Sequence, residues 1–161
     1  MVNITLIIMK IITLSQQDKR WGNITLGNTN YKMSRYGCLV TCLSAISDWC
    51  RQFKGMYINP GEAARGLRFN KDGLLLWESL GGIFQFVLEK RLYHSSPTLI
   101  KAAMDDPYRC VVLQVNSNHW VWCLGKSLLG GWKIMDPWYG DVSTTRRYKN
   151  NISGFAILKL K

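Results

Sequence analysis

A cysteine that opens a helical segment is the residue of this chain best placed for nucleophilic chemistry. In the stretch RYGCLVTCLSAISDW, Cys38 follows Gly37 and precedes apolar side chains at helical spacing. A thiol attacks a carbonyl carbon as the thiolate, and the partial positive charge at a helix N-terminus stabilises that anion. Cys38 is therefore a candidate nucleophile.

A nucleophilic cysteine needs a base and a group that orients the base. The chain has two histidines, and we expect His94, in a loop before a helix, to be exposed or to cap that helix. His119 opens the segment HWVWCLGK, and Asp136 follows near the end of the next apolar segment. If these segments are adjacent antiparallel strands joined by the Gly-Gly turn, His119 and Asp136 lie side by side. Asp136 then accepts a hydrogen bond from one imidazole nitrogen while the other nitrogen faces Cys38.

The remaining cysteines indicate core packing rather than metal binding. Five cysteines are an odd number without a CxxC pair, and the two histidines lack zinc-finger spacing. We expect no metal and no cofactor, and mostly reduced, buried thiols, although the sequence leaves a disulfide open. Cys42, one helical turn after Cys38, is expected to be buried beneath it rather than to act as a resolving thiol.

The hydrophobic pattern predicts an α+β fold in which an N-terminal helix packs on a C-terminal antiparallel sheet. Helices are expected over 38–52, over 60–67 with Asn59 as N-cap, within 74–83 up to Gly81-Gly82, and from Ser96-Pro97 to before Pro107. Consecutive antiparallel strands are expected over 110–115, 119–126, 132–138 and 155–160.

Length and charge limit the class of protein. The 161 residues fit one domain, 1–161, in which 1–10 is a possible extension and 1–8 an upstream addition or an added strand. Lys and Arg outnumber Asp and Glu by 21 to 10, so an anionic surface is a possible partner, but the basic residues are scattered and no specific nucleic-acid motif is present. The apolar start lacks a basic region and a cleavage site, and it is too short for a membrane span. We therefore expect no signal peptide and a cytoplasmic or phage-associated protein.

Four sequence blocks, in this order, carry a resemblance to a known family. They are a Q-x-D-x-R-W block, a Gly-Cys pair before a helix, a histidine opening a strand, and a D-P-W-x-G block. The chain meets them at Gln16, Asp18, Arg20 and Trp21; at Gly37 and Cys38; at His119; and at Asp136, Pro137, Trp138 and Gly140. Over residues 11–160 the chain resembles the C39-like branch of the papain-type cysteine peptidases, which is common in bacteria and their phages.

The resemblance implies a papain-like fold and a set of roles. Cys38 would be the nucleophile, His119 the general base and then acid, Asp136 the orienting group, and Gln16 an oxyanion-hole donor beside the Cys38 N–H. Trp138 and Gly37 would lie at the substrate cleft. Asp18, Arg20 and Trp21 would brace the loop that presents Gln16.

Two features depart from the family pattern. The 22-residue gap from Gln16 to Cys38 is longer than usual, so the intervening loop must fold away, and Gln17 is the alternative donor. The chain also lacks a transporter domain, so a role in peptide export does not carry over.

The expected function is hydrolysis of an amide or peptide bond in a peptide, a protein or a peptidoglycan stem peptide. The alternatives are a phage-type peptidoglycan peptide hydrolase, a catalytically inactive C39-like domain that binds a peptide or the cell wall, and a nucleic-acid-binding protein that depends on charge.

Overall fold

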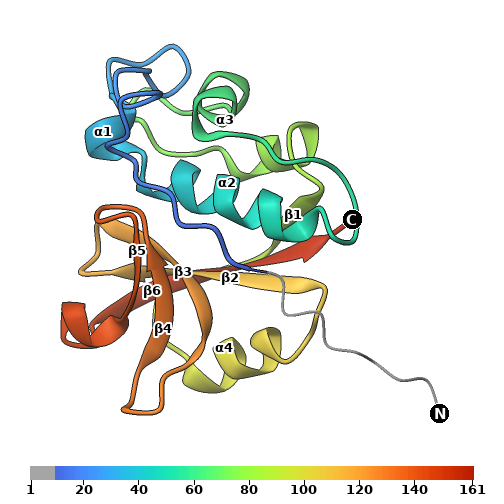
Figure 1. Cartoon of the computed structure of the whole chain (residues 1–161), viewed down its shortest axis with the longest axis vertical. Coiled ribbons are helices and arrows are strands. Elements are labelled where there is room, and N and C mark those ends of the chain that lie inside the picture. Colours follow the sequence, from blue (N-terminus) through green and yellow to red (C-terminus); the bar gives the residue numbers. More distant parts are fainter. Residues whose placement is uncertain (1–9) are drawn as a thin grey trace.

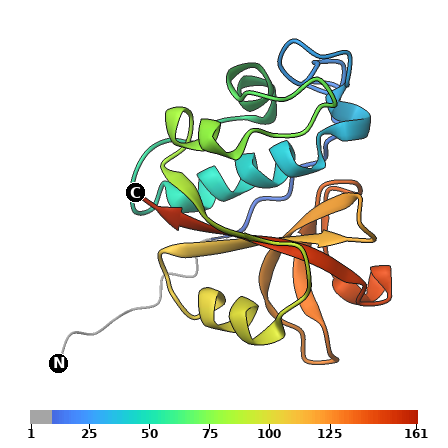
Figure 2. The same ribbon diagram turned by 180° about the vertical axis from the view of Figure 1, so that it is seen from behind.

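The computed structural model describes residues 10–161 and has an α+β architecture built on one six-stranded antiparallel sheet (Figures 1 and 2). The expected extension at residues 1–8 lies outside the described residues. The elements, in chain order, are α1 (Met33–Tyr36), α2 (Cys38–Cys50), α3 (Pro60–Gly66), η1 (Trp77–Gly82), β1 (Phe86–Leu92), α4 (Pro97–Met104), β2 (Arg109–Val115), β3 (His119–Lys126), β4 (Trp132–Asp136), β5 (Asp141–Thr144), η2 (Thr145–Tyr148) and β6 (Ile152–Leu160). Within residues 10–161, no helix has the length and apolar character needed to cross a bilayer.

The strand order in the sheet is β1-β6-β2-β3-β4-β5. The prediction that β2, β3 and β4 pair in succession is confirmed. The prediction was wrong for the last strand, because β6 pairs with β1 and β2 rather than following β4. The apolar run of β6 is buried on both faces from Gly154 to Leu158, which suits a central strand and not an edge strand.

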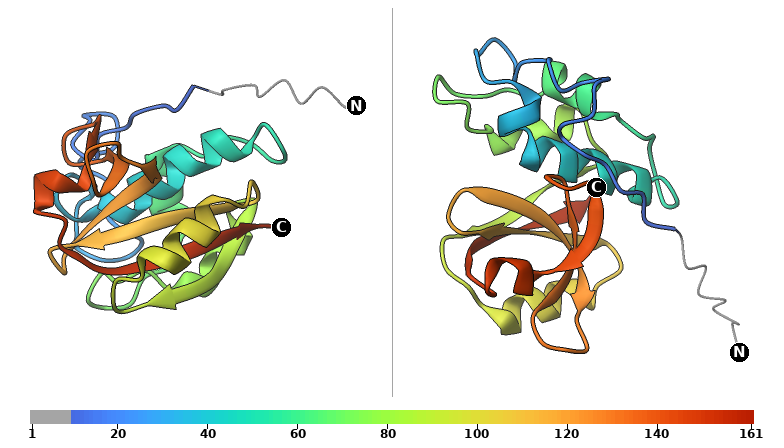
Figure 3. Two further views of the ribbon diagram at one scale, coloured as in Figure 1. Left: turned by 90° about the horizontal axis from the view of Figure 1, so that it is seen from below. Right: turned by 60° about the vertical axis from the view of Figure 1, so that its left-hand side comes forward.

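Helices cover both faces of the sheet, as Figure 3 shows from two directions. Alternate side chains of β2 point to opposite faces of the sheet. Cys110 and Val112 pack in the core that contains α2. Val111 and Leu113 pack in the core that contains Ile100 of α4. The sheet is therefore the middle layer of the molecule, with α1, α2, α3 and η1 on one side and α4 on the other.

Local sequence signals account for where the helices begin. The Asn59 side chain accepts a hydrogen bond from Glu62 N at 2.9 Å, and Pro60 is the first residue of α3. Ser96 caps α4 in the same way through Leu99 N. The helix expected within 74–83 is a 3₁₀ helix, η1.

Four elements were not anticipated from the sequence: α1, β1, β5 and η2. The β1 segment FVLEKRL carries three consecutive charged residues on an edge strand, so it lacks the apolar run of the central strands. The other three are only four residues each, too short to show a period.

Helix α2 is the buried axis of its layer, since every one of its residues except Trp49 is buried. Its first residue is Cys38, so the predicted position of this cysteine at the start of the helix is confirmed. Gly37 both ends α1 and precedes α2. A Cβ at Gly37 would lie 2.5 Å from Met33 Sδ and 2.6 Å from Met33 O, so the turn into α2 has no room for a side chain.

We predict that Gly37→Ala lowers the free energy of unfolding by about 1–3 kcal/mol, because the added methyl group overpacks the turn against Met33. Urea denaturation measures the change. Gly82→Ala is the matched control, because a Cβ there meets no atom within 4 Å. Equal stability of the two variants would contradict the packing argument.

Candidate active site

The candidate catalytic residues come from two layers of the fold. Cys38 is the first residue of α2, whereas His119 begins β3 and Asp136 ends β4. Because β3 and β4 are antiparallel neighbours, the start of one and the end of the other lie at the same end of the sheet. Cys38 and His119 line the same open cleft there, which has a volume of about 530 Å³.

His119 and Asp136 are joined directly. Nε2 of His119 lies 2.9 Å from Oδ1 of Asp136, so the side-by-side arrangement predicted from the strand order is confirmed. Because Nε2 of His119 is hydrogen-bonded to Asp136, Nδ1 is the ring nitrogen that remains to interact with Cys38.

Asp136 is a fully buried carboxylate that accepts four hydrogen bonds. Besides His119, Oδ1 accepts from Trp138 N at 3.1 Å. Oδ2 accepts from Arg147 Nη1 at 2.8 Å and from Tyr148 Oη at 2.6 Å. Burial alone raises the pKa of Asp136, but the hydrogen bonds from His119, Tyr148 and Arg147 outweigh burial and hold the pKa below its ordinary value. Asp136 is therefore charged at neutral pH.

The environment of His119 favours its protonated form. Burial lowers the pKa of the imidazole, but hydrogen bonding to Asp136 and to Cys38, and the charges of these two groups, raise it to about 9. An imidazolium beside a thiol is the partner that a thiolate needs.

Cys38 and Cys42 have different surroundings although they are one helical turn apart. Cys38 is 8% exposed and lines the cleft. As the first residue of α2, it belongs to the turn whose N–H groups have no partner inside the helix. Cys42 is completely buried, its Sγ lies 3.6 Å from Trp120 O, and burial raises the pKa of its thiol. The predicted burial of Cys42 is confirmed, and all five cysteines are unpaired.

Gln16 and Gln17 occupy different positions. Gln16 is buried, and its Nε2 donates to Ser34 O at 3.2 Å, with Met33 O at 3.5 Å. Its Oε1 has no hydrogen-bond partner among residues 10–161. Gln17 donates from Nε2 to Trp138 O at 2.9 Å, on the loop after β4. Of the two, Gln16 is the one beside the turn that leads to Cys38.

The loop that carries Gln16 is braced as expected. Asp18 and Arg20 form an ion pair at 2.8 Å, and the Arg20 guanidinium lies 4.5 Å from the centre of the Trp21 ring. Trp21 Nε1 donates to Ser15 O at 2.8 Å. These contacts tie the two ends of the 15–21 loop together around Gln16.

The long gap between Gln16 and Cys38 folds into a hairpin-like excursion. Thr25 pairs with Lys32 in an antiparallel bridge, and Ser34 N donates to Gly22 O at 2.9 Å. The chain thus returns to Gln16 before it enters α2. The excursion does not fold away from the site, because Leu26 and Tyr31 line a pocket together with Cys38.

Aromatic and polar side chains surround the cleft. The residues that line it are Arg35, Tyr36, Cys38, Asn118, His119, Trp138, Tyr139 and Tyr148. Cys38 also lines a second pocket of about 310 Å³, whose walls include Leu26, Phe69, Leu75 and Trp120. Trp138 lies at the cleft as expected, whereas Gly37 lines neither pocket in the described chain and serves the close packing of α1 against α2.

Arg147 and Tyr148 are site residues that sequence reasoning missed. They lie in η2, and they reach Asp136 because β5 turns the chain back beside β4. No spacing signal pointed to them, since their contact with Asp136 depends on a strand of four residues. His94 is exposed in the loop after β1, with Nδ1 3.1 Å from Ser95 O, and it takes no part in the cleft.

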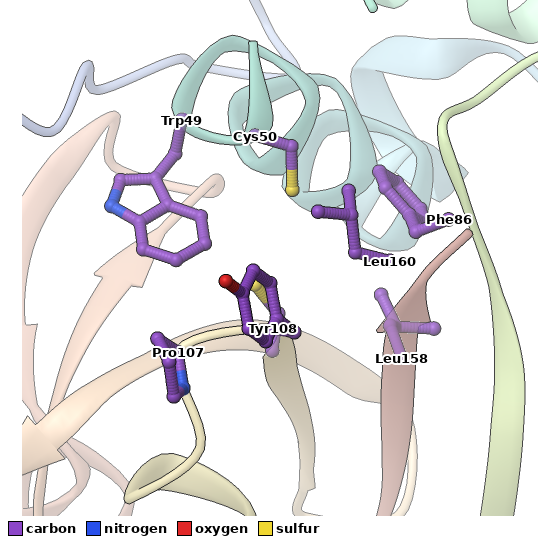
Figure 4. Close-up of a pocket in the computed structure, with 8 residues that line it drawn as sticks. Trp49, Cys50, Phe86, Pro107, Tyr108, Leu158 and Leu160 are labelled. Carbon is purple, nitrogen blue, oxygen red and sulfur yellow. The ribbon is translucent and has the colours of Figure 1, made fainter. Parts of the chain in front are cut away.

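Two other features of the described structure can be compared with this cleft. Residues 10–161 contain no cluster of three or more His, Cys, Asp or Glu side chains that is able to hold a metal ion. The pocket at the C-terminal end of α2, with Cys50 and Tyr108 among its walls, encloses about 10 Å³ (Figure 4). That space is no larger than one water molecule.

Comparisons of the sequence with models of known protein families and with curated proteins give no match. The case for a function therefore depends on the geometry of the cleft and on the resemblance of the four sequence blocks.

We predict that the His119 imidazole titrates at about 9 in an NMR pH titration and that its pKa falls in Asp136→Asn. Asparagine lacks the negative charge that stabilises the imidazolium. Only Cys38 then raises the His119 pKa against the lowering effect of burial. Cys38→Ala should also lower the pKa, for the same reason. A His94→Gln background leaves a single histidine to observe. An unchanged pKa in both variants would contradict the described contacts.

Proposed function

We propose that this chain is a cysteine hydrolase of amide bonds, with a papain-like fold of the C39-like type. The observation that carries the proposal is the hydrogen-bonded pair of the partly buried His119 and the buried Asp136. His119 lines one cleft with Cys38, the first residue of a buried helix. Helix α2 supplies the nucleophile, and the sheet supplies the base. This arrangement is the one that the sequence resemblance implies.

In the proposed reaction, the Cys38 thiolate attacks the carbonyl carbon of the substrate amide. The electron pair of the carbonyl double bond moves to the oxygen, and the Cys38 N–H at the start of α2 donates to that oxyanion. The tetrahedral intermediate collapses as Nδ1 of His119 gives its proton to the leaving amine, which leaves an acyl group on Cys38. Neutral His119 then takes a proton from water, the water attacks the acyl group, and the thiolate is released with a carboxylic acid.

Gln16 is proposed as the second donor to the oxyanion. Its Nε2 carries two hydrogens, of which one serves Ser34 O at 3.2 Å. The 3.5 Å separation from Met33 O is at the long limit of a hydrogen bond, so the second hydrogen is weakly used. A substrate oxygen would be the better partner for it, which requires the amide to turn toward the cleft, because Gln16 is fully buried and lines neither pocket of the described chain.

Asp136 is proposed to orient the base, and the surrounding donors support that role. Arg147 and Tyr148 hold Oδ2, so Oδ1 stays directed at His119 Nε2. The raised pKa of His119 keeps the imidazolium present before the substrate arrives.

We predict that iodoacetamide modifies Cys38 at least tenfold faster than any other cysteine at neutral pH. Cys38 lines the cleft at a helix N-terminus, whereas burial raises the pKa of the thiols of Cys42 and Cys123. Mass spectrometry of peptides measures the labelling. Turnover is measured on fluorogenic peptides, casein and purified peptidoglycan, and Cys38→Ala should lower it by about a thousandfold or more.

Cys123→Ala is the matched control, because Cys123 is a buried thiol in the core on the α4 side of the sheet. It should keep both the labelling of Cys38 and the turnover. Uniform labelling of the five cysteines, or turnover by Cys38→Ala, would exclude a cysteine hydrolase.

We predict that kcat/KM falls as the pH rises through about 9, because the imidazolium that donates to the leaving amine is then lost. Asp136→Asn should move this limb to lower pH and reduce kcat/KM on the order of 10 to 100-fold. If the asparagine keeps its oxygen toward Arg147 and Tyr148, its NH₂ group faces Nε2 of His119. The N–H at Nε2 then has no acceptor.

The comparison of pH profiles decides whether the site is a triad. An unchanged rate with an unchanged profile in Asp136→Asn would reduce the proposed triad to a dyad of Cys38 and His119. Urea denaturation of the same variant separates a loss of fold from a loss of catalysis.

A further inference from the structure

Exposed aromatic rings gather around the cleft beside Cys38 and His119. Tyr36 is 47% exposed, Trp138 42% and Tyr139 59%, and all three line this cleft. A single exposed ring is ordinary on a protein surface, but several large apolar side chains around one hollow mark a binding surface.

The backbone around Trp138, rather than its ring, carries the structural contacts of this loop. Trp138 N donates to Asp136 Oδ1, and Trp138 O accepts from Gln17 Nε2. Gln16 N also donates to Pro137 O at 2.9 Å. The loop after β4 is therefore fixed while the indole ring stays at the surface, already in place for a ligand.

Tyr139 is positioned by a neighbouring cation. The Arg147 guanidinium lies 4.1 Å from the centre of its ring and is held in turn by Asp136 and Asp141. The cation lies over one face of the ring, and since Tyr139 is 59% exposed, the remaining surface of the residue is open to a ligand. Tyr139 thus presents aromatic surface to the cleft at low cost in side-chain entropy.

The shape and polarity of the cleft indicate the chemistry of the ligand. An apolar side chain is best bound in an enclosed apolar pocket. Here the rings line an open cleft together with hydrogen-bonding groups, namely Arg35, Asn118 and the tyrosine hydroxyls. A ligand that fits has a flat face of C–H groups to lie on the negative face of an aromatic ring and a polar edge to meet the donors. A sugar ring has both.

We infer that the substrate is a peptide joined to a saccharide, with the sugar lying on the rings of Trp138 and Tyr139. The inference rests on the proposed function for the amide that is cleaved, but the saccharide site is a separate claim about binding. The second pocket, which Cys38 also lines and which has both apolar and polar walls, is left for the peptide. The excess of basic over acidic residues suits an anionic polymer that bears such peptides.

The test uses the full chain with Cys38→Ser, so that binding is measured without turnover. Isothermal titration calorimetry compares a disaccharide–tetrapeptide fragment of peptidoglycan with the same tetrapeptide lacking the sugars. We expect the sugar-linked fragment to bind at least tenfold more tightly. Adding Trp138→Ala or Tyr139→Ala should remove most of that preference and leave binding of the free peptide nearly unchanged.

Tyr93→Ala is the matched control, because Tyr93 is an exposed tyrosine after β1 that does not line the cleft. It should keep the full preference. Equal affinity for the two probes, or a preference that survives loss of both rings, would overturn the saccharide site. So would tighter binding of a peptide with an added phenylalanine than of the sugar-linked fragment, because the rings would then serve an apolar side chain.

The saccharide site and the hydrolase fail in different ways. If the sugar preference is observed but wild-type chain cleaves neither probe, the site stands and the hydrolase does not. If wild-type chain cleaves both probes and the Cys38→Ser chain binds them equally, the hydrolase stands and the saccharide site is wrong.

Discussion

The buried charge of Asp136 is the constraint on which the geometry of the site depends. A carboxylate without exposure to water is tolerated only when its oxygens are fully hydrogen-bonded. The donors come from β3, from the loop after β4 and from η2, so three segments must meet at one point. If one of them moved away, the remaining donors would have to compensate a buried charge. These hydrogen bonds tie the three segments together at the end of the sheet that faces the cleft.

The helix α2 supplies the other half of the site through a different kind of interaction. It is held by burial on nearly all sides rather than by charge, and its entry point is fixed by the contact of Gly37 with Met33. Apolar packing sets where Cys38 lies, while hydrogen bonds to one carboxylate set where His119 lies. The cleft forms where α2 and the sheet, which share one hydrophobic core, meet.

The sequence was sufficient for the parts of the fold that have strong local signals. Asn59 and Ser96 before prolines marked helix starts correctly, and the pairing of β3 with β4 followed from two apolar segments and a Gly-Gly turn. The position of β6 was beyond local reasoning, because it depends on pairing with strands that are distant in sequence. Arg147 and Tyr148 were missed for the same reason. Their partner, Asp136, was evident from the sequence. The short strand β5, which brings Arg147 and Tyr148 back beside Asp136, was not.

The central place of β6 has a consequence for how the chain is made. Residues 152–160 pair with both β1 and β2, so those two strands have no shared neighbour until this segment has left the ribosome. Such distant pairings form late because a long loop must close first. The neighbouring strands β2, β3 and β4, which include His119 and Asp136, come earlier in the chain and pair with one another. Helix α2 contacts β2 and β3, so it has a surface to pack on before β6 joins β1 to the sheet.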